Sequence, residues 1–245
     1  MSQVVFDLPH AVEFVRARQA FLNRWLPDLV ASRQLTSALD VGSGVGYFAR
    51  YLADLGLRTT GLEGRPENVV EAARRHPDVE FRVCDLEQVD EAAVSPADLV
   101  LCLGFLYHVE NPARVIRTLH AMTARVLVVE SVFAPDEAPV ARVVEEPMTR
   151  DQALTHLALV VSRSCAVKLL YRAGFTFVYE TLELPDHDEF RASTGRWARR
   201  SWLVAAKESV PLPGLRLVAD APYADPWQKP WSRYAAAAGR LLRHS

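Results

Sequence analysis

The sequence predicts an α/β fold in which a mostly parallel sheet is covered by helices on both faces. From residue 38 to about 132, short runs rich in Val and Leu alternate with amphipathic stretches of helical length, which is typical of successive β-α-β units. Three glycines at alternate positions, Gly42, Gly44 and Gly46, separate the first strand from the first helix. A length of 245 residues suits one such domain with modest additions.

The residues before 37 are predicted to form one or two helices. Their apolar side chains recur at three- and four-residue steps, which makes one helical face apolar: Val12, Val15, Phe21, Leu22, Trp25, Leu26 and Leu29. Two roles are open for this segment, 1–36. It is either a structural cap on the edge of the sheet or a lid over a ligand crevice.

The central segment, 37–208, holds the predicted sheet. Strands are predicted at Ser37–Val41, Arg58–Glu63, Val79–Cys84, Ala97–Leu103 and Arg125–Ser131. Helices are predicted between them at Tyr47–Leu55, Pro66–Arg75 and Pro112–Met122, with a weaker one over Leu86–Ala93. The two prolines suit the first turn of a helix, which supports these starting points.

The second half of the chain is less regular. The stretch FAPDEAPVARVVEEP after Ser131 is acidic and punctuated by prolines, so the interval 132–160 is predicted to be a loop. A helix over Ser162–Arg172 is followed by two β-rich runs, Phe175–Leu184 and Arg200–Lys207, which are predicted to form a closing hairpin. The tail, 209–245, is rich in Pro and Trp and is predicted to wrap over the surface without forming a second domain.

Composition narrows the classes of function. The formal net charge is −2, so the chain as a whole lacks an electrostatic footprint for nucleic acid. Cys84, Cys102 and Cys165 are isolated from one another, which favours a reducing, cytoplasmic location. No signal peptide is expected at the start of the sequence, and no apolar run reaches the ~20 residues that span a bilayer, so no membrane partner is expected.

The glycine turn indicates a nucleotide-type ligand and excludes two common binding loops. Glycines there let the backbone turn sharply and let a ligand lie on it at a helix N-terminus. The third glycine comes one residue too early for the dinucleotide fingerprint G-x-G-x-x-G, and no Lys-Ser/Thr pair serves a P-loop. The candidate binding residues of this segment are Asp40, Gly42, Ser43, Gly44, Gly46, Tyr47 and Phe48.

Acidic residues follow the next two predicted strands. Glu63 ends the second strand about twenty residues past the glycine turn, and its carboxylate can accept both hydroxyls of a ribose. Gly64 and Arg65 come next, and Arg65 is a candidate either for the ligand or for an ion pair with a neighbouring glutamate. Asp85 follows the third strand and precedes Leu86, where an Asp is also a common helix N-cap.

The fourth strand and the loop after it carry the second strong signal, D-L-V-L-C-x-G-x-L-Y-H-x-x-N-P. Leu103 and Gly104 end the strand, and Tyr107 and His108 are predicted to face the crevice at its carboxyl end. An imidazole ordinarily titrates near ~6.5, which suits a general base that takes a proton from a hydroxyl. A structural hydrogen-bonding role is the alternative for the histidine. Glu130 ends the fifth strand and is predicted to point toward the same crevice.

These segments together resemble the class I S-adenosylmethionine (SAM)-dependent methyltransferases over roughly residues 36 to 208. The turn D-x-G-x-G-x-G is similar to motif I of that family, and the Leu-Tyr-His segment is similar to a variant of its motif IV. The resemblance implies a doubly wound sheet of seven strands with the last antiparallel. It also implies that SAM binds at the carboxyl ends of the strands and leaves as S-adenosylhomocysteine (SAH).

The resemblance also implies roles for single residues. Asp40 would lie near the amino acid end of SAM, although an Asp there can also hold the glycine turn through backbone N–H groups. Asp85 would accept from the adenine amine, while the backbone N–H of Leu86 would meet a ring nitrogen. Leu103 and Gly104 would complete the cofactor site. The candidate catalytic residues are His108, Tyr107 and Glu130.

The expected reaction is methyl transfer from SAM to a hydroxyl of a small metabolite, sugar or natural product, mainly through alignment of the reactants. Two alternatives stay open. The Leu-Tyr-His-x-x-x-Pro element is similar to that of enzymes acting on 5-hydroxyuridine at tRNA wobble positions, with Arg196, Arg199, Arg200 and Lys207 as a patch for phosphates. The other alternative is a non-catalytic SAM-binding module.

No metal site is expected, because the His187-Asp188-Glu189 run has no second spaced pair of ligands. A small-molecule acceptor is the expected partner, and the sequence does not predict an oligomeric state.

Overall fold

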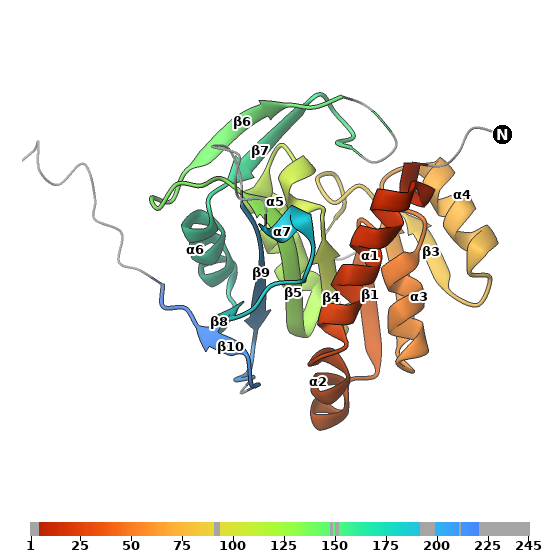
Figure 1. Cartoon of the computed structure of the whole chain (residues 1–245), viewed down its shortest axis with the longest axis horizontal. Coiled ribbons are helices and arrows are strands. Elements are labelled where there is room, and N and C mark those ends of the chain that lie inside the picture. The colour runs from red at the N-terminus through yellow and green to blue at the C-terminus, as the bar shows by residue number, and fades with distance from the viewer. Residues whose placement is uncertain are drawn as a thin grey trace, which may run out of the picture.

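An eight-stranded sheet forms the centre of the computed structural model, which describes residues 5–90, 94–147, 149, 152–191, 199–210 and 212–220 (Figure 1). The strand order is β10-β8-β9-β5-β4-β1-β2-β3. Its members are β1 (Ser37–Val41), β2 (Arg58–Glu63), β3 (Glu80–Val83), β4 (Ala97–Leu103), β5 (Thr123–Phe133), β8 (Phe177–Thr181), β9 (Arg199–Ala206) and β10 (Leu215–Leu217).

The sheet is mostly parallel, as the sequence predicts. Strands β3, β2, β1, β4 and β5 run in one direction, and β9 inserts antiparallel between β5 and β8. The predicted closing hairpin is therefore present as the β8–β9 pair. The prediction of seven strands omits β10, which pairs antiparallel with β8. Strand β10 comes from the segment that was expected only to wrap over the surface. It pairs with the backbone groups of β8, which would otherwise be the edge strand of the sheet. Residues 221–245 of the tail lie outside the described residues.

Helices cover both faces of the sheet. They are α1 (Pro9–Leu22), α2 (Leu26–Arg33), α3 (Tyr47–Asp54), α4 (Pro66–Arg75), α5 (Pro112–Met122), α6 (Arg163–Ala173) and the short α7 (Asp188–Arg191), with 3-10 turns η1 (Val5–Asp7) and η3 (Leu106–His108). None of the described helices combines the length and apolar character needed to cross a membrane.

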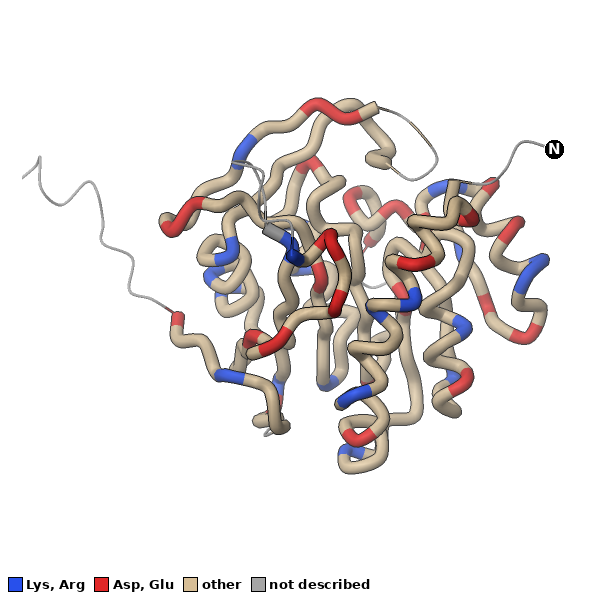
Figure 2. The backbone as a smooth tube through the Cα atoms, viewed as in Figure 1, with Lys and Arg blue, Asp and Glu red and all other residues tan. Residues whose placement is uncertain are grey.

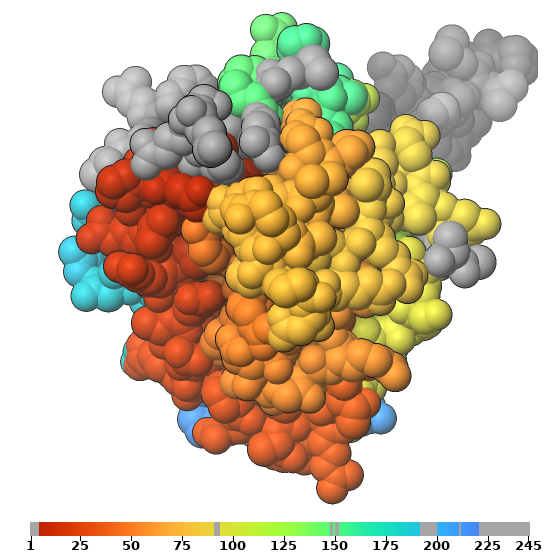
Figure 3. All heavy atoms as spheres, turned by 90° about the vertical axis from the view of Figure 1, so that its right-hand side faces the viewer, coloured from red at the N-terminus to blue at the C-terminus, as the bar shows by residue number. Residues whose placement is uncertain are grey.

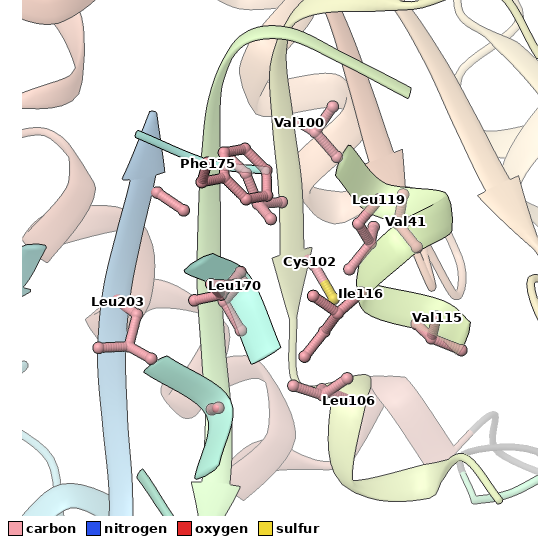
Figure 4. Close-up of a cluster of buried hydrophobic side chains, with 14 of the residues drawn as sticks. Val41, Val100, Cys102, Leu106, Val115, Ile116, Leu119, Leu170, Phe175 and Leu203 are labelled. Atoms are coloured by element: carbon pink, nitrogen blue, oxygen red, sulfur yellow. The ribbon is translucent and has the colours of Figure 1, made fainter. Parts of the chain in front are cut away.

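Strand β4 shows how the two faces are made. Its side chains alternate, so Leu99 and Leu101 pack with the core beneath α1, α2 and α3, while Val100 and Cys102 pack with the core beneath α5 and α6. All four side chains are fully buried. Figure 4 shows Ile116 of α5 beside Cys102 in this second core. A continuous apolar run is thus explained by burial on both faces.

Local signals set the helix ends where the sequence predicts them. The side chain of Asn111 accepts a hydrogen bond from the amide of Arg114 at the start of α5. Ser162 does the same for the amide of Cys165 at the start of α6. Helix α6 ends at Gly174, whose φ of 118° is in the left-handed region.

Two sequence-based expectations about elements are wrong. The interval 132–160 is not a loop: β5 continues to Phe133, and β6 (Ala141–Glu145) pairs antiparallel with β7 (Leu157–Val161) in a separate ribbon. The prolines are confined to the segments that flank the paired residues, so they do not interrupt the ladder. The weak helix over Leu86–Ala93 is absent through residue 90, where the chain forms turns around the backbone carbonyl of Asp85. Residues 91–93 lie outside the described residues.

Candidate active site

A pocket of about 270 Å³ lies at the carboxyl ends of the parallel strands. Its walls come from the turn after β1, the end of β2, the turn after β3, and the end of β4 with η3. The N-terminal segment and residues 152–154 complete the walls. This is the edge where ligands of open α/β sheets bind. All the predicted site residues line this pocket except Asp40, Gly46 and Glu130.

The glycine turn is tied to the neighbouring strand. The amides of Gly42 and Ser43 both donate to the carbonyl of Leu62, at 2.8 and 3.0 Å. Gly46 has a φ of 90°, and a Cβ there would meet the ring of Phe81 at 2.7 Å, so only glycine suits this position. Gly46 precedes α3 and has no side chain to cap the helix, and Tyr47 and Phe48 of its first turn line the pocket.

Asp40 lies beneath the glycine turn and away from the pocket surface. Its residue is 1% exposed, and its carboxyl group accepts a hydrogen bond from the backbone of Ala49 in α3. The Oδ2 atom has no hydrogen-bond partner among the described residues. Burial raises the pKa of Asp40 to about 7, although the Ala49 hydrogen bond and Arg18 oppose the rise. The hydrogen bond to Ala49 connects Asp40 to the first turn of α3, and its role toward the glycine turn or a ligand stays a prediction.

Glu63 connects the turn to the next wall of the pocket. Its Oε2 accepts from the amide of Gly44 at 2.9 Å, and its Oε1 accepts from the amide of Arg65 at 3.0 Å. The side-chain amide of Asn68 also donates to Oε1, at 3.4 Å. An ionised carboxylate has about four acceptor positions, so these three bonds leave room for a ribose hydroxyl.

Asp85 and Leu86 form the wall across from this turn. The Oδ1 atom of Asp85 accepts from the amide of Glu87 at 2.9 Å, so the side chain stabilises the turn that it begins. Both residues also line the pocket. The capping role and a ligand-binding role for Asp85 are therefore compatible.

A buried ionic cluster lies next to the ends of β4 and β5. Glu130 is fully buried and accepts from Arg18 of α1 at 3.2 Å and from Arg200 of β9 at 2.8 Å. Arg200 also donates to the hydroxyl of Tyr107 at 3.3 Å. Burial raises the pKa of Tyr107, so the phenol keeps its proton. Glu130 thus has two guanidinium partners and does not reach the pocket surface.

Arg200 does not belong to a solvent-facing phosphate patch. Its side chain is 9% exposed and is occupied by Glu130 and Tyr107. Arg196 lies outside the described residues. Over the described chain, Lys and Arg are interspersed with Asp and Glu (Figure 2). Arg200 is therefore not available to contact phosphates, which weakens the prediction of a basic patch for nucleic acid.

The N-terminal helix contributes both to the core and to the wall of the pocket, and its role as a cap or a lid stays a prediction. Phe21 and Leu22 at its end pack in the core, whereas Phe14 and Arg18 line the pocket. In the space-filling view, the red N-terminal residues lie beside the orange residues of the glycine-turn side (Figure 3). Arg18 was not predicted from the sequence. Its position four residues from both Phe14 and Leu22 places it on the apolar face of the helix, which indicated that its side chain is buried.

His108 faces the pocket and has a partner that the sequence did not indicate. Its Nδ1 lies 2.6 Å from the Oε2 of Glu146, which follows β6. The ring of Tyr107 stacks at a tilt on the His108 ring, with centroids 3.9 Å apart. Glu146 was missed because it lies in the interval expected to be a loop.

The same interval closes another side of the pocket. The guanidinium of Arg65 donates to the carbonyl of Ala153 at 2.6 Å, and a Cβ on Gly64 would meet Leu154 at 2.6 Å. Arg65 therefore fastens the segment after β6 to the end of β2, in place of an ion pair with a neighbouring glutamate.

His187 has a structural environment. Its Nδ1 accepts from the amide of Glu189 at 3.1 Å, and its ring packs against Phe14 with centroids 5.1 Å apart. Within the described ranges, no three His, Cys, Asp or Glu side chains are grouped so that they could hold a metal ion.

Comparison with known proteins gives a family match over most of the chain. Residues 14–180 match the family described as a methyltransferase domain. The ubiquinone biosynthesis O-methyltransferase of Bordetella avium is 31% identical over 103 residues, which are 40% of this chain and 42% of that protein. The enzyme of the same description from Pseudomonas paraeruginosa is 35% identical over 91 residues, 35% of this chain and 39% of that protein. The chain thus matches less than half the length of these relatives.

Solved structures share the fold. The N-terminal domain of EvdMO1 with SAH bound superimposes with a TM-score of 0.63 at 23% identity, covering 78% of this chain and 79% of that domain. Magnesium protoporphyrin IX methyltransferase (ChlM) from Synechocystis PCC 6803 with bound SAM gives a TM-score of 0.55 at 21% identity, covering 85% and 86%. At such identities the likeness concerns the fold alone.

Proposed function

Because the chain belongs to the methyltransferase-domain family of class I SAM-dependent methyltransferases, we propose that it transfers a methyl group from SAM to a hydroxyl of a small molecule. The observation that carries the proposal is the convergence of Gly44, Glu63 and His108 on one pocket. Gly44 and Glu63 suit a nucleoside that carries an amino acid group, and His108 suits an acceptor whose hydroxyl is deprotonated in the reaction.

The pocket residues fit SAM. A Cβ at Gly44 would lie 3.2 Å from the ring of Phe6, so glycine lets the N-terminal segment pack closely over the turn. Glu63 would accept a ribose hydroxyl, Asp85 would accept from the adenine amine, and the first turn of α3 would face the amino acid end. Arg18, which pairs with Glu130, also lines the pocket near Gly104.

The acceptor would lie against η3. When bound, SAM supplies an electrophilic methyl group on a positively charged sulfur. After transfer, that sulfur is the neutral thioether of SAH. His108 would take the hydroxyl proton on a ring nitrogen while the acceptor oxygen forms its bond to the methyl carbon. Phe14, Tyr107 and Phe105 line the pocket and would exclude water from the reacting atoms. Alignment supplies the larger part of the rate enhancement.

The names of the relatives support oxygen as the acceptor atom. Both enzymes described above are O-methyltransferases by description. A tRNA acceptor has less support, because Arg200 is buried in the ionic cluster.

The test is a screen with methyl-labelled SAM against hydroxylated metabolites, phenols, sugars and bulk tRNA. We expect SAH to form with a hydroxylated small molecule and the label to reside in an ether. Label in tRNA would establish the wobble-uridine alternative. Binding of SAM without turnover of any acceptor would favour the non-catalytic module.

Replacement of His108 tests its part in the reaction. His108→Ala is expected to lower kcat about 100-fold or more while leaving the Kd for SAM within about twofold, because general base catalysis contributes ~10²–10⁴. His156→Ala, an exposed histidine in the same region, is the matched control. Equal kcat values for His108→Ala and wild type would restrict His108 to packing.

A further inference from the structure

The β6–β7 ribbon brings an acidic side chain to the candidate base. Glu146 lies 38 residues beyond His108 in the sequence, yet its Oε2 is 2.6 Å from Nδ1 of the imidazole. Both side chains are about one-tenth exposed, at 11% for His108 and 10% for Glu146. A contact this short between two shielded groups has little competition from water.

The ribbon holds Glu146 rigidly. The Oε2 atom also accepts from the amide of Ala153 at 3.2 Å, and the amide of Glu146 donates to the carbonyl of His156 at 2.9 Å. On the other side, the amide of Leu159 in β7 donates to the carbonyl of Val109, directly after His108, at 2.8 Å. The carboxylate and the imidazole are therefore fixed to each other through the backbone as well as through their side chains.

This contact selects one tautomer of the neutral imidazole. An ionised carboxylate only accepts hydrogen bonds, so Nδ1 must carry the proton that it donates to Glu146. The lone pair then resides on Nε2, and no group among the described residues hydrogen-bonds that atom. Nε2 is then the ring nitrogen that is able to accept a proton, and His108 lines the pocket.

We propose that Glu146 is a positioning residue, which holds the His108 ring in the Nδ1–H tautomer and in one orientation so that Nε2 faces the acceptor hydroxyl. The inference rests on the proposed methyl transfer. In the reaction, the hydroxyl proton moves to Nε2, and Glu146 remains ionised and stabilises the imidazolium that forms. The connection between β6 and β7 also contacts the end of β2 through the Arg65–Ala153 hydrogen bond, so this part of the chain borders both sides of the pocket.

The kinetic test compares two neighbouring glutamates. Glu146→Gln keeps the volume of the side chain but lets an amide donate to Nδ1, which favours the wrong tautomer. Its kcat is expected to fall about 10- to 100-fold, which is less than the ~10²–10⁴ of a lost general base because the imidazole itself is kept. Kd for SAM and KM for the acceptor should stay within about twofold. Glu145→Gln, an exposed residue at the end of β6, should keep wild-type kcat. The double variant His108→Ala/Glu146→Gln should be no slower than His108→Ala, because the two residues act as a unit.

A spectroscopic test requires no turnover. In protein labelled with ¹⁵N-histidine and saturated with SAH at pH 8, the His108 ring should show a protonated Nδ1 and an unprotonated Nε2, assigned by its absence from His108→Ala. Glu146→Gln should shift population to the Nε2–H form, and Glu145→Gln should not.

The outcomes separate the two proposals. A wild-type Nε2–H tautomer, or full kcat in folded Glu146→Gln, overturns the role of Glu146 while methyl transfer stands. Absence of wild-type turnover with every acceptor contradicts the proposed function, and the tautomer measurement then decides the pairing by itself. If Glu145→Gln lost as much kcat as Glu146→Gln, the contact between Glu146 and His108 would only stabilise the ribbon.

Discussion

Asp40 is a proton-binding group placed under the ligand turn. Burial is the main reason that its pKa rises to about 7, while the ordinary value for Asp is about 3.9. Between these two values the folded chain holds a proton that the unfolded chain has lost. The folded state therefore binds more protons over the range from about pH 4 to 7, and the contribution of Asp40 to stability falls as the pH rises through that range.

The Asp40→Asn variant should remove this dependence. Its free energy of unfolding, relative to wild type, is expected to increase by about 2–4 kcal/mol between pH 4 and pH 8, because an amide has no proton to lose. Urea unfolding at several pH values measures the difference. Asp28→Asn in α2, an exposed position, is the control, and a wild-type-to-variant difference that stays constant with pH would contradict the raised pKa.

Glu63 has a structural contact on each carboxylate oxygen and a predicted contact with the ribose. Glu63→Ala is expected to weaken SAM binding about 10- to 100-fold, since hydrogen bonds to a charged group contribute about 1.5–3 kcal/mol. Calorimetric titration measures the Kd. Glu13→Ala, an exposed glutamate on α1, should bind as wild type does, and unchanged affinity in Glu63→Ala would remove the ribose assignment.

The residues that sequence reasoning placed correctly in the pocket belong to local patterns. Gly44 and His108 follow strands and Glu63 ends one, and the carboxyl ends of parallel strands meet at one edge of the sheet. Arg18 and Glu146 escaped prediction because each reaches the site through packing between distant segments, and no local spacing records such packing.

At the scale of elements, the N-terminal segment is fastened across two helices. The carboxylate of Asp7 accepts from the hydroxyl of Tyr47 in α3 at 2.9 Å and from the guanidinium of Arg75 in α4 at 2.8 and 2.7 Å. The Arg75 hydrogen bonds are the main reason that the pKa of Asp7 is lowered. This contribution to stability is present above the ordinary pKa of Asp and is lost as the pH falls through the lowered value. Phe6 is thereby held over Gly44.

Asp7→Asn should release the segment without unfolding the protein. We expect faster amide hydrogen exchange in residues 5–12 and little change in the midpoint of global unfolding, because partly exposed ion pairs contribute little to total stability. Dissociation of SAH, measured by stopped flow, should accelerate. Unaltered exchange in 5–12 would show that packing of α1 alone holds the segment.

The strands that the sequence predicted lie in the main sheet, whereas β6, which it missed, lies outside it. The strands β1 and β4 are buried on both faces and appear as largely apolar segments between helices. Strand β6 is mostly exposed and pairs only with β7, outside the main sheet. Its short Val143-Val144 run, between acidic and proline-rich residues, has no apolar periodicity that distinguishes it from a loop.

At the scale of the molecule, the pocket is one site built by residues 5–154. Ligand binding to the folded state alone should therefore stabilise the whole domain. At about 100 times its Kd, SAH is expected to contribute about 2.7 kcal/mol and to raise Tm by roughly 5–10 °C. Thermal unfolding monitored by circular dichroism measures this shift. Glu63→Ala should show a smaller shift at the same SAH concentration, and an equal shift would place SAH elsewhere.

The ionic cluster at Glu130 links three parts of the chain that are made at different times. Arg18 is 112 residues from Glu130 in sequence, and Arg200 is 70 residues away. Strand β9 also enters the sheet between β5 and β8, after both have been synthesised. Until β9 docks, the carboxylate lacks one of its two guanidinium partners, and burying it is unfavourable. We therefore expect the pocket to be among the last regions to become ordered during synthesis, with nascent chains that end before residue 199 unable to retain SAH.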